Sequence, residues 1–191
     1  MTERVNHLFS NSTHENLDEH QLIADVRKDP RKFGLLYKKY ANPVYRYIFT
    51  RTGNKQIAED ITSQTFLAAL ESFRKFRQDG NFGSWLFTIA RNKVNDHFRF
   101  SKPVAPIHEA RFITGEGDSL DLSIQSDQAK IVQTLIKKLP EDEQELLRLR
   151  FIAELSFSNI ARLLHKSEDA VKKSTYRLLA RLQSQVEVNN E

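Results

Sequence analysis

FSNIARLLHKSEDAVKKSTYRLLARLQ, residues 157–183, is the most informative stretch of this sequence about its architecture. Apolar residues recur at three-to-four spacing in FSNIARLL and again in EDAVKKSTYRLLARLQ, which predicts two helices separated by the turn 165–167. A short helix, a tight turn and a longer helix have helix-turn-helix proportions. Such turns usually have glycine where this chain has His165, so a left-handed backbone there would carry some strain.

The second of these helices has two chemically different faces. At about 100° per residue, Val171, Leu178 and Leu182 fall on one stripe, which we expect to pack inward. The opposite half is polar and mostly basic, and it carries Asp169, Lys172, Lys173, Tyr176, Arg177 and Ala180. Ser167 can cap the helix and leave its positive end free to meet a phosphate. This face suits DNA, although a basic helix face often meets only solvent.

A second divided helix is predicted at 84–100, SWLFTIARNKVNDHFRF. Its apolar side holds Leu86, Ala90 and Val94, together with His97. The opposite arc carries hydroxyl, amide and guanidinium groups, which are Thr88, Arg91, Asn92, Asn95 and Arg99. Such groups suit phosphate oxygens and base edges, and neither use needs a catalytic pKa.

The loop before this helix, RQDGNFGS at 77–84, contains two glycines. We expect Ser84 to cap the helix that follows. Trp85, the only tryptophan, lies at the border between the two arcs and beside Phe82. Two roles are open for it: a packed support that fixes the loop, which we favour, or a platform on which an unpaired base stacks.

The rest of the chain also has helical period and no sustained strand alternation, so we predict an all-α protein. Asp29 and Asn54 read as N-caps, the latter for a helix that runs to about Phe76, and Pro43 begins or kinks another helix. Residues 101–127 have no helical period and hold five acids against two bases. We therefore expect two small helical domains with separate cores, at 18–100 and 128–186, an irregular acidic linker at 101–127, and a flexible extension at 1–17.

Composition excludes several kinds of protein. With no cysteine, the chain has no disulfide, thiolate metal site or thiol nucleophile. The polar start and the lack of a bilayer-length apolar run predict a cytosolic protein. The six histidines are scattered, which speaks against an enzyme. A metal site in the N-terminal segment is conceivable, but a solvated segment fits better, so we expect no cofactor or metal; the residues concerned are His14, Glu15, Asp18, Glu19 and His20.

Three segments, in this order, resemble the two-domain bacterial sigma factors of the extracytoplasmic-function (ECF, group 4) division of the sigma-70 family. They are AEDITSQTFLAALESFRKF at 58–76, GSWLFTIARNKVNDHFR at 83–99, and LPEDEQELLRLRFIAELSFSNIARLLHKSEDAVKKSTYRLLARL at 139–182. The resemblance covers roughly residues 18–184. It implies that 18–100 is sigma region 2, which binds polymerase and the −10 promoter element, and that 128–186 is sigma region 4, which reads the −35 element.

The resemblance also implies a polymerase-binding segment, with which such factors grip the clamp helices. Its residues here are Asp60, Ile61, Gln64, Thr65 and Phe66. Asp60 and Gln64 lie four apart and so share one helix face. The family usually has glutamine and then an acid where this chain has Ser63 and Gln64, which makes the contact less acidic.

Two DNA-reading surfaces are implied in the same way. The loop 79–84 resembles the one that captures a base flipped from the −10 element, and the helix after it resembles the adjoining duplex-reading surface; the residues are Asp79, Asn81, Phe82, Ser84, Trp85, Thr88, Arg91, Asn92, Asn95 and Arg99. The residues implied at the −35 element are Ser167, Asp169, Lys172, Lys173, Tyr176 and Arg177. The acidic linker resembles the connector that threads polymerase channels built for nucleic acid.

The expected function is therefore that of a sigma factor, which binds core RNA polymerase and directs promoter-specific initiation. Expected partners are core polymerase, promoter DNA and an anti-sigma factor, which could hold this cytoplasmic protein at the membrane. A conventional helix-turn-helix regulator is the alternative. It would explain residues 128–186 but not the polar helix at 84–100, and it would bind its operator without polymerase.

Overall fold

A computed structural model describes residues 12–77, 81–100 and 127–188. Within these ranges every regular element is a helix and no strand is present, which confirms the all-α prediction. The longer helices are α2 (Ser12–Lys28), α3 (Phe33–Thr52), α4 (Lys55–Ser72), α5 (Phe82–Phe100), α6 (Asp127–Lys137), α7 (Glu141–Leu147), α8 (Phe157–Leu164) and α9 (Glu168–Val188). Short turns of other pitch are η1 (Pro30–Lys32), η2 (Phe73–Lys75) and η3 (Arg148–Ile152).

The helix α4 and the turn η1 begin where their predicted capping residues lie. The Asn54 side chain accepts a hydrogen bond from the backbone N–H of Ile57 at 3.1 Å, which starts α4. Asp29 caps the 3₁₀ turn η1 in the same way. One boundary differs from the prediction, since α4 ends at Ser72 and continues to Lys75 only as η2. Pro43 lies inside α3, so it does not begin that helix, which was one of its two predicted roles.

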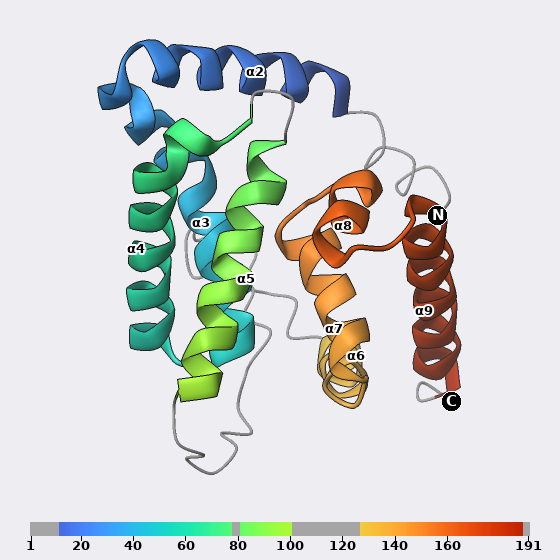
Figure 1. Ribbon diagram of the computed structural model, residues 1–191. Coiled ribbons are helices and arrows are strands. Elements are labelled where there is room, and N and C mark those ends of the chain that lie inside the picture. The colour runs from blue at the N-terminus through green and yellow to red at the C-terminus, as the bar shows by residue number, and fades with distance from the viewer. Residues whose placement is uncertain (1–11, 78–80, 101–126, 189–191) are drawn as a thin grey trace.

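Helices α3, α4 and α5 pack beside one another, and α2 lies across one end of them (Figure 1). Their contact is made by large apolar side chains, of which Leu36, Tyr47, Phe82 and Phe87 are fully buried. Burying such side chains is the main source of stability for a domain without disulfides.

The C-terminal half contains the predicted helix-turn-helix in α8 and α9. His165 ends α8 with a left-handed backbone (φ 55°, ψ 43°), as its place in the turn predicts. Ser167 caps α9, because its Oγ accepts from the backbone N–H of Ala170 at 3.2 Å. Val171, Leu178 and Leu182 are buried, which confirms the inward stripe of the helix.

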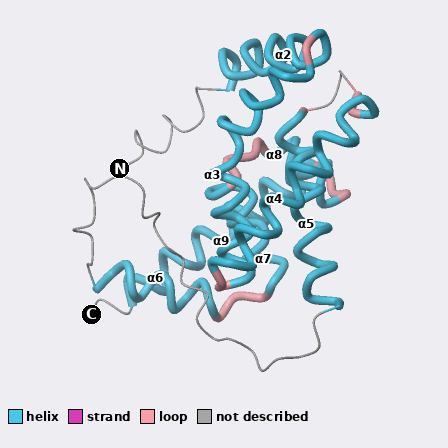
Figure 2. Tube along the Cα trace, turned by 90° about the vertical axis from the view of Figure 1, so that its left-hand side faces the viewer, coloured by secondary structure: helices cyan, strands magenta, loops and turns pink. Residues whose placement is uncertain are grey.

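The two helical domains do not have separate cores, and that prediction is wrong. One continuous cluster of buried side chains runs from α3 and α5 into η3, α8 and the start of α9. Helix α8 lies against α5, while α9 lies on the far side of α8 (Figure 1), and the turned view in Figure 2 keeps α8 beside the α3–α5 group. A second, smaller cluster holds α6, α7 and α9 together.

Two predicted segments, the N-terminal extension and the acidic linker, are described only in part. Helix α2 already begins at Ser12, so the extension predicted to be flexible through residue 17 is helical in its second part. Residues 101–126 of the predicted acidic linker lie outside the described residues. Its last residue, Asp127, is the first residue of α6. None of the described helices is both long and apolar enough to cross a membrane.

Candidate nucleic-acid interface

The outward face of α9 is open and basic. Lys173, Tyr176 and Arg177 are exposed, with half of the Tyr176 side-chain surface accessible. Lys172 differs from them because its Nζ lies 2.8 Å from Glu168, and this hydrogen bond raises the pKa of Lys172 above its ordinary value. Asp169 is exposed in the first turn. The face predicted to meet DNA is therefore available, although one of its lysines already has an acidic partner.

The start of α5 is built differently from the prediction. The helix begins at Phe82, and its cap is Asn81, whose Oδ1 accepts from the backbone N–H of Ser84 at 2.7 Å. Ser84 therefore lies inside the first turn, is 7% exposed, and donates its hydroxyl to the carbonyl of Asn159 in α8 at 3.1 Å. Its predicted role as the cap is wrong.

Phe82 belongs to an aromatic cluster rather than to a DNA-facing loop. It is fully buried, with ring-centroid distances of 5.7 Å to Phe76 and 5.6 Å to Trp85. A side chain in that position cannot touch DNA in this conformation, and its contact with DNA stays a prediction. Trp85 is half-buried and also lies 5.0 Å from Phe76. This packing favours the supporting role for Trp85. Asp79 lies outside the described residues.

A cavity of about 320 Å³ opens beside this cluster. Its walls from the N-terminal half include Asn81, Trp85 and Thr88, with Lys75 and Arg77 adding positive charge. Arg162 and Leu163 of α8 close one side. The cavity thus combines an aromatic wall, amide and hydroxyl groups and cations, which is the chemistry that an unpaired nucleotide needs.

The polar arc of α5 is only partly free. Thr88, Asn92 and Arg99 are exposed. Asn95 is also exposed, but its Oδ1 accepts a hydrogen bond from Arg51 at 3.0 Å. Arg91 is turned toward the C-terminal half, where its Nε lies 3.3 Å from Glu145. The structure therefore brings the predicted arc together as one face, and places one of its cations against an acid of α7.

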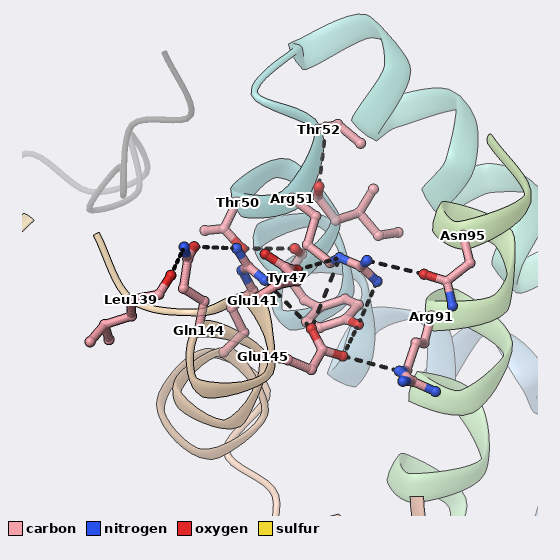
Figure 3. A network of polar contacts seen from close by, with 12 residues as sticks. Tyr47, Thr50, Arg51, Thr52, Arg91, Asn95, Leu139, Glu141, Gln144 and Glu145 are labelled. Atoms are coloured by element: carbon pink, nitrogen blue, oxygen red, sulfur yellow. Dashed lines mark hydrogen bonds and ion pairs between the residues drawn. The ribbon is translucent and has the colours of Figure 1, made fainter. Parts of the chain in front are cut away.

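Glu145 is the centre of a polar network between the two halves of the protein (Figure 3). It is 6% exposed, and its Oε1 accepts from the Tyr47 hydroxyl at 2.7 Å. The guanidinium groups of Arg51 and Arg148 lie 3.9 and 3.6 Å from its other carboxylate oxygen. Three arginines and a tyrosine thus surround one buried carboxylate.

The network is electrostatically coherent. Burial, followed by the negative charge of Glu145, raises the pKa of Tyr47 far above its ordinary value, so the hydroxyl remains a donor. Arg148 is also held by Glu141 at 2.7 Å and by Gln144 at 2.8 Å. An isolated buried carboxylate would be costly, and here the neighbouring cations and the hydroxyl offset part of that cost, although Oε2 of Glu145 has no hydrogen-bond partner among the described residues. The sequence gives no signal for this network, because its members lie far apart along the chain.

The predicted polymerase-binding segment lies on α4 and divides into two sets. Asp60 and Gln64 are exposed, and they share one face as predicted. Ile61, Thr65 and Phe66 are at most 5% exposed and pack into the core, so they are not accessible to polymerase in this conformation, and their contacts with it stay a prediction. The helical period of the sequence is enough to separate the two sets, because the buried residues recur at three-to-four spacing and the exposed residues lie between them.

Two exposed apolar residues on the same helix are absent from the predicted set. Leu67 is 57% exposed and Leu70 is 45% exposed, and they lie three residues apart beside Gln64. Neighbouring large apolar side chains on an outer helix face suit contact with another protein. A helical wheel extended past Phe66 would have found them.

Two family models match the chain, one for each half. Sigma-70 region 2 matches residues 36–103, and Sigma-70, region 4 matches residues 129–182. The ECF RNA polymerase sigma factor BldN of Streptomyces coelicolor is 38% identical over 159 residues, which cover 78% of this chain and 58% of that protein. The ECF RNA polymerase sigma factor SigM of Bacillus subtilis is 28% identical over 154 residues, which cover 78% of this chain and 91% of that protein.

Solved structures show the same fold at lower identity. CnrH, solved in complex with the cytosolic domain of CnrY, matches with a TM-score of 0.64 at 23% identity, over 89% of this chain and 97% of CnrH. The sigma factor RpoE of Bartonella quintana, solved with the anti-sigma factor NepR, matches with a TM-score of 0.59 at 22% identity, over 83% of this chain and 98% of RpoE. With both sigma regions present in order and these relatives alongside, the chain belongs to the ECF group of the sigma-70 family, the RNA polymerase sigma factors of promoter-directed transcription initiation.

Proposed function

We propose that this protein binds core RNA polymerase through α4 and directs it to promoters by reading the −10 element with α5 and the −35 element with α9. Residues 18–100 then act as region 2, 101–127 as the connector and 128–186 as region 4. One observation carries the proposal: the chain presents two separate DNA-suited faces, one on each half matched by a sigma region.

The two faces divide the work. Lys173, Tyr176 and Arg177 suit base edges and phosphates in the major groove, where the start of α9 would enter. The cavity beside Trp85 suits one unpaired base, and capturing that base costs a few kcal/mol of unstacking. Neither module needs to bind tightly alone, because attachment to one polymerase raises the effective concentration of the second.

The two faces are not both available in the closed arrangement. Glu145 holds Arg91, and Arg162 and Leu163 cover one side of the cavity. Promoter recognition therefore requires the two halves to part, and binding to polymerase is the step that would separate them. The buried network around Glu145 and the apolar packing of α5 against α8 must both break for this to happen.

Sigma factors are not enzymes, and the proposed activity needs no catalytic residue, metal or cofactor from this chain. We place the protein in the bacterial cytoplasm, where transcription occurs. An anti-sigma factor is a further proposed partner, since the similar folds of CnrH and RpoE were solved with CnrY and NepR. A membrane-attached partner of this kind would hold the protein at the membrane.

The decisive experiment adds the purified chain to bacterial core RNA polymerase with a promoter library and maps the transcript starts. Specific starts that core polymerase alone does not make would support the proposal. A conventional regulator, which the sigma-region matches do not favour, would instead bind its operator tightly without polymerase. Sequence-specific, tight binding by the free protein with no polymerase-dependent starts would contradict the proposal.

A further inference from the structure

Helix α2 lies outside both DNA-suited faces, yet two of its side chains bind the backbone on either side of the loop before α5. Glu19 is 8% exposed, and its Oε1 accepts a hydrogen bond from the backbone N–H of Phe82 at 3.1 Å. Its other carboxylate oxygen accepts from the hydroxyl of Tyr40. Toward the other end of α2, Arg27 donates to the carbonyl oxygen of Phe76.

Glu19 binds a backbone group that α5 itself cannot satisfy. Phe82 is the first residue of α5, and its N–H is one of the donors that a helix leaves without an internal partner. Glu19 satisfies this donor and brings negative charge to the positive end of the helix. Asn81 satisfies the N–H of Ser84, so the side chains of Glu19 and Asn81 together fix the first turn of α5.

The surroundings leave little freedom at this point. A Cβ on Gly83 would lie 3.3 Å from both the Tyr40 ring and the Asn81 side chain, so α3 and α5 approach closely where Glu19 binds. Between Glu19 and Arg27, Ile23 and Val26 are each 1% exposed and anchor α2 in the core. Eight residues of helix span about 12 Å, so α2 is a rigid strut between the two ends of the loop.

We propose that Glu19, assisted by Arg27, is a positioning residue for −10 recognition: it fixes where Asn81 and Trp85 stand as walls of the base-binding cavity. This inference rests on the proposed function of that cavity. Glu19 touches no DNA in this role, and acts only through the start of α5. The length of the Glu19 side chain matters more than its charge. A glutamine has the same length and still offers an oxygen to the Phe82 N–H, whereas an aspartate is one methylene too short to reach it.

The test uses the full chain bound to core polymerase, with Glu19→Gln, Glu19→Asp and Glu19→Ala. The first probe is a promoter, chosen from the library above, with 2-aminopurine at each −10 non-template position in turn, so that fluorescence reports the flipped base. The second is the −35 duplex alone. Asp25→Ala is the matched control, because Asp25 is an acid of the same helix whose side chain binds surface groups, Lys32 at 3.4 Å and Gln21 at 3.1 Å.

We expect Glu19→Ala and Glu19→Asp to weaken capture of the −10 base about tenfold, the scale of one lost hydrogen bond, and to reduce the fluorescence signal accordingly. Glu19→Gln and the control should stay near wild type, and −35 binding should not change in any variant. Equal loss in Glu19→Gln and Glu19→Asp, or an unchanged Glu19→Ala, would overturn the positioning role alone. No fluorescence signal from the wild-type holoenzyme would overturn the cavity's proposed function, and the positioning role with it.

Discussion

Trp85 packs its indole against Phe76 and Phe82, with ring centroids 5.0 and 5.6 Å away, at the point where the loop meets α5. Trp85→Leu should therefore lower the free energy of unfolding by roughly 1–3 kcal/mol, because the smaller side chain leaves the aromatic cluster underpacked. Promoter opening should fall together with stability. Thermal unfolding and permanganate reactivity of the −10 thymines measure the two effects.

Phe98→Leu is the matched control for that variant, since Phe98 is on the same helix and half of its surface is exposed. It should change neither quantity appreciably. Loss of promoter opening by Trp85→Leu at an unchanged melting temperature would instead assign Trp85 to direct stacking on a base.

For single residues, the sequence predicted which kinds of side chain form the site, but it did not predict which residue caps α5. Asn81 and Ser84 are both good N-caps, so local rules could not choose between them. Tertiary contacts decide between them. Phe82 is buried in the aromatic cluster, and its N–H donates to the carboxylate of Glu19, so the helix begins at Phe82, two residues before the predicted start at 84. Both contacts come from elsewhere in the chain, which a local pattern does not report.

Helix α9 carries the second prediction. Lys173→Ala and Arg177→Ala should each reduce transcription from promoters that need the −35 element, by an amount set by roughly 1–3 kcal/mol per lost base contact. Runoff transcription by the reconstituted holoenzyme measures this, with a promoter that does not depend on the −35 element as reference. Unchanged output from both variants would remove the −35 assignment of this face.

Lys172→Ala provides the comparison within the same helix. Its ammonium is already bound by Glu168 at 2.8 Å, so its removal should cost less than that of Lys173. A larger loss for Lys172 than for Lys173 would mean that the ion pair opens on DNA and that Lys172 is the principal contact.

Among the elements, strongly periodic helices were the most predictable. FSNIARLL and the capped α9 were predicted closely because their period, cap and turn agree. The one turn of π-helix at η3, which follows α7 directly, gives no comparable signal in the sequence. On α4, the family resemblance assigned one segment to polymerase as a whole, whereas helical period places exposed Asp60 and Gln64 on one face and core Ile61 and Phe66 on the other.

For the molecule as a whole, the division of DNA reading between two modules predicts weak binding by the free protein. Its affinity for promoter duplex should fall steeply with salt, because phosphate contacts would supply most of it. Holoenzyme should bind the same promoter much more tightly at the same salt. Fluorescence anisotropy across a salt series measures both, and tight, salt-insensitive binding by the free chain would contradict the shared mechanism.

The closed arrangement gives the last prediction, because one buried carboxylate links the halves. Glu145→Gln keeps an acceptor for Tyr47 but removes the charge that attracts Arg51 and Arg91, so the free protein should populate open forms more often. Dyes on Lys55→Cys and Ser184→Cys, both exposed, report this by energy transfer, and the native chain has no cysteine to compete for the label.

Glu143→Gln makes the same charge change in a different place, since Glu143 pairs with Arg181 inside the C-terminal half. Energy transfer should therefore fall in Glu145→Gln and stay at the wild-type value in Glu143→Gln. The opened variant should also bind −10 single strand better than wild type without polymerase, because Arg91 and the cavity beside Trp85 are uncovered. Equal energy transfer in all three proteins would mean that apolar packing between α5 and α8, rather than the Glu145 network, holds the halves together.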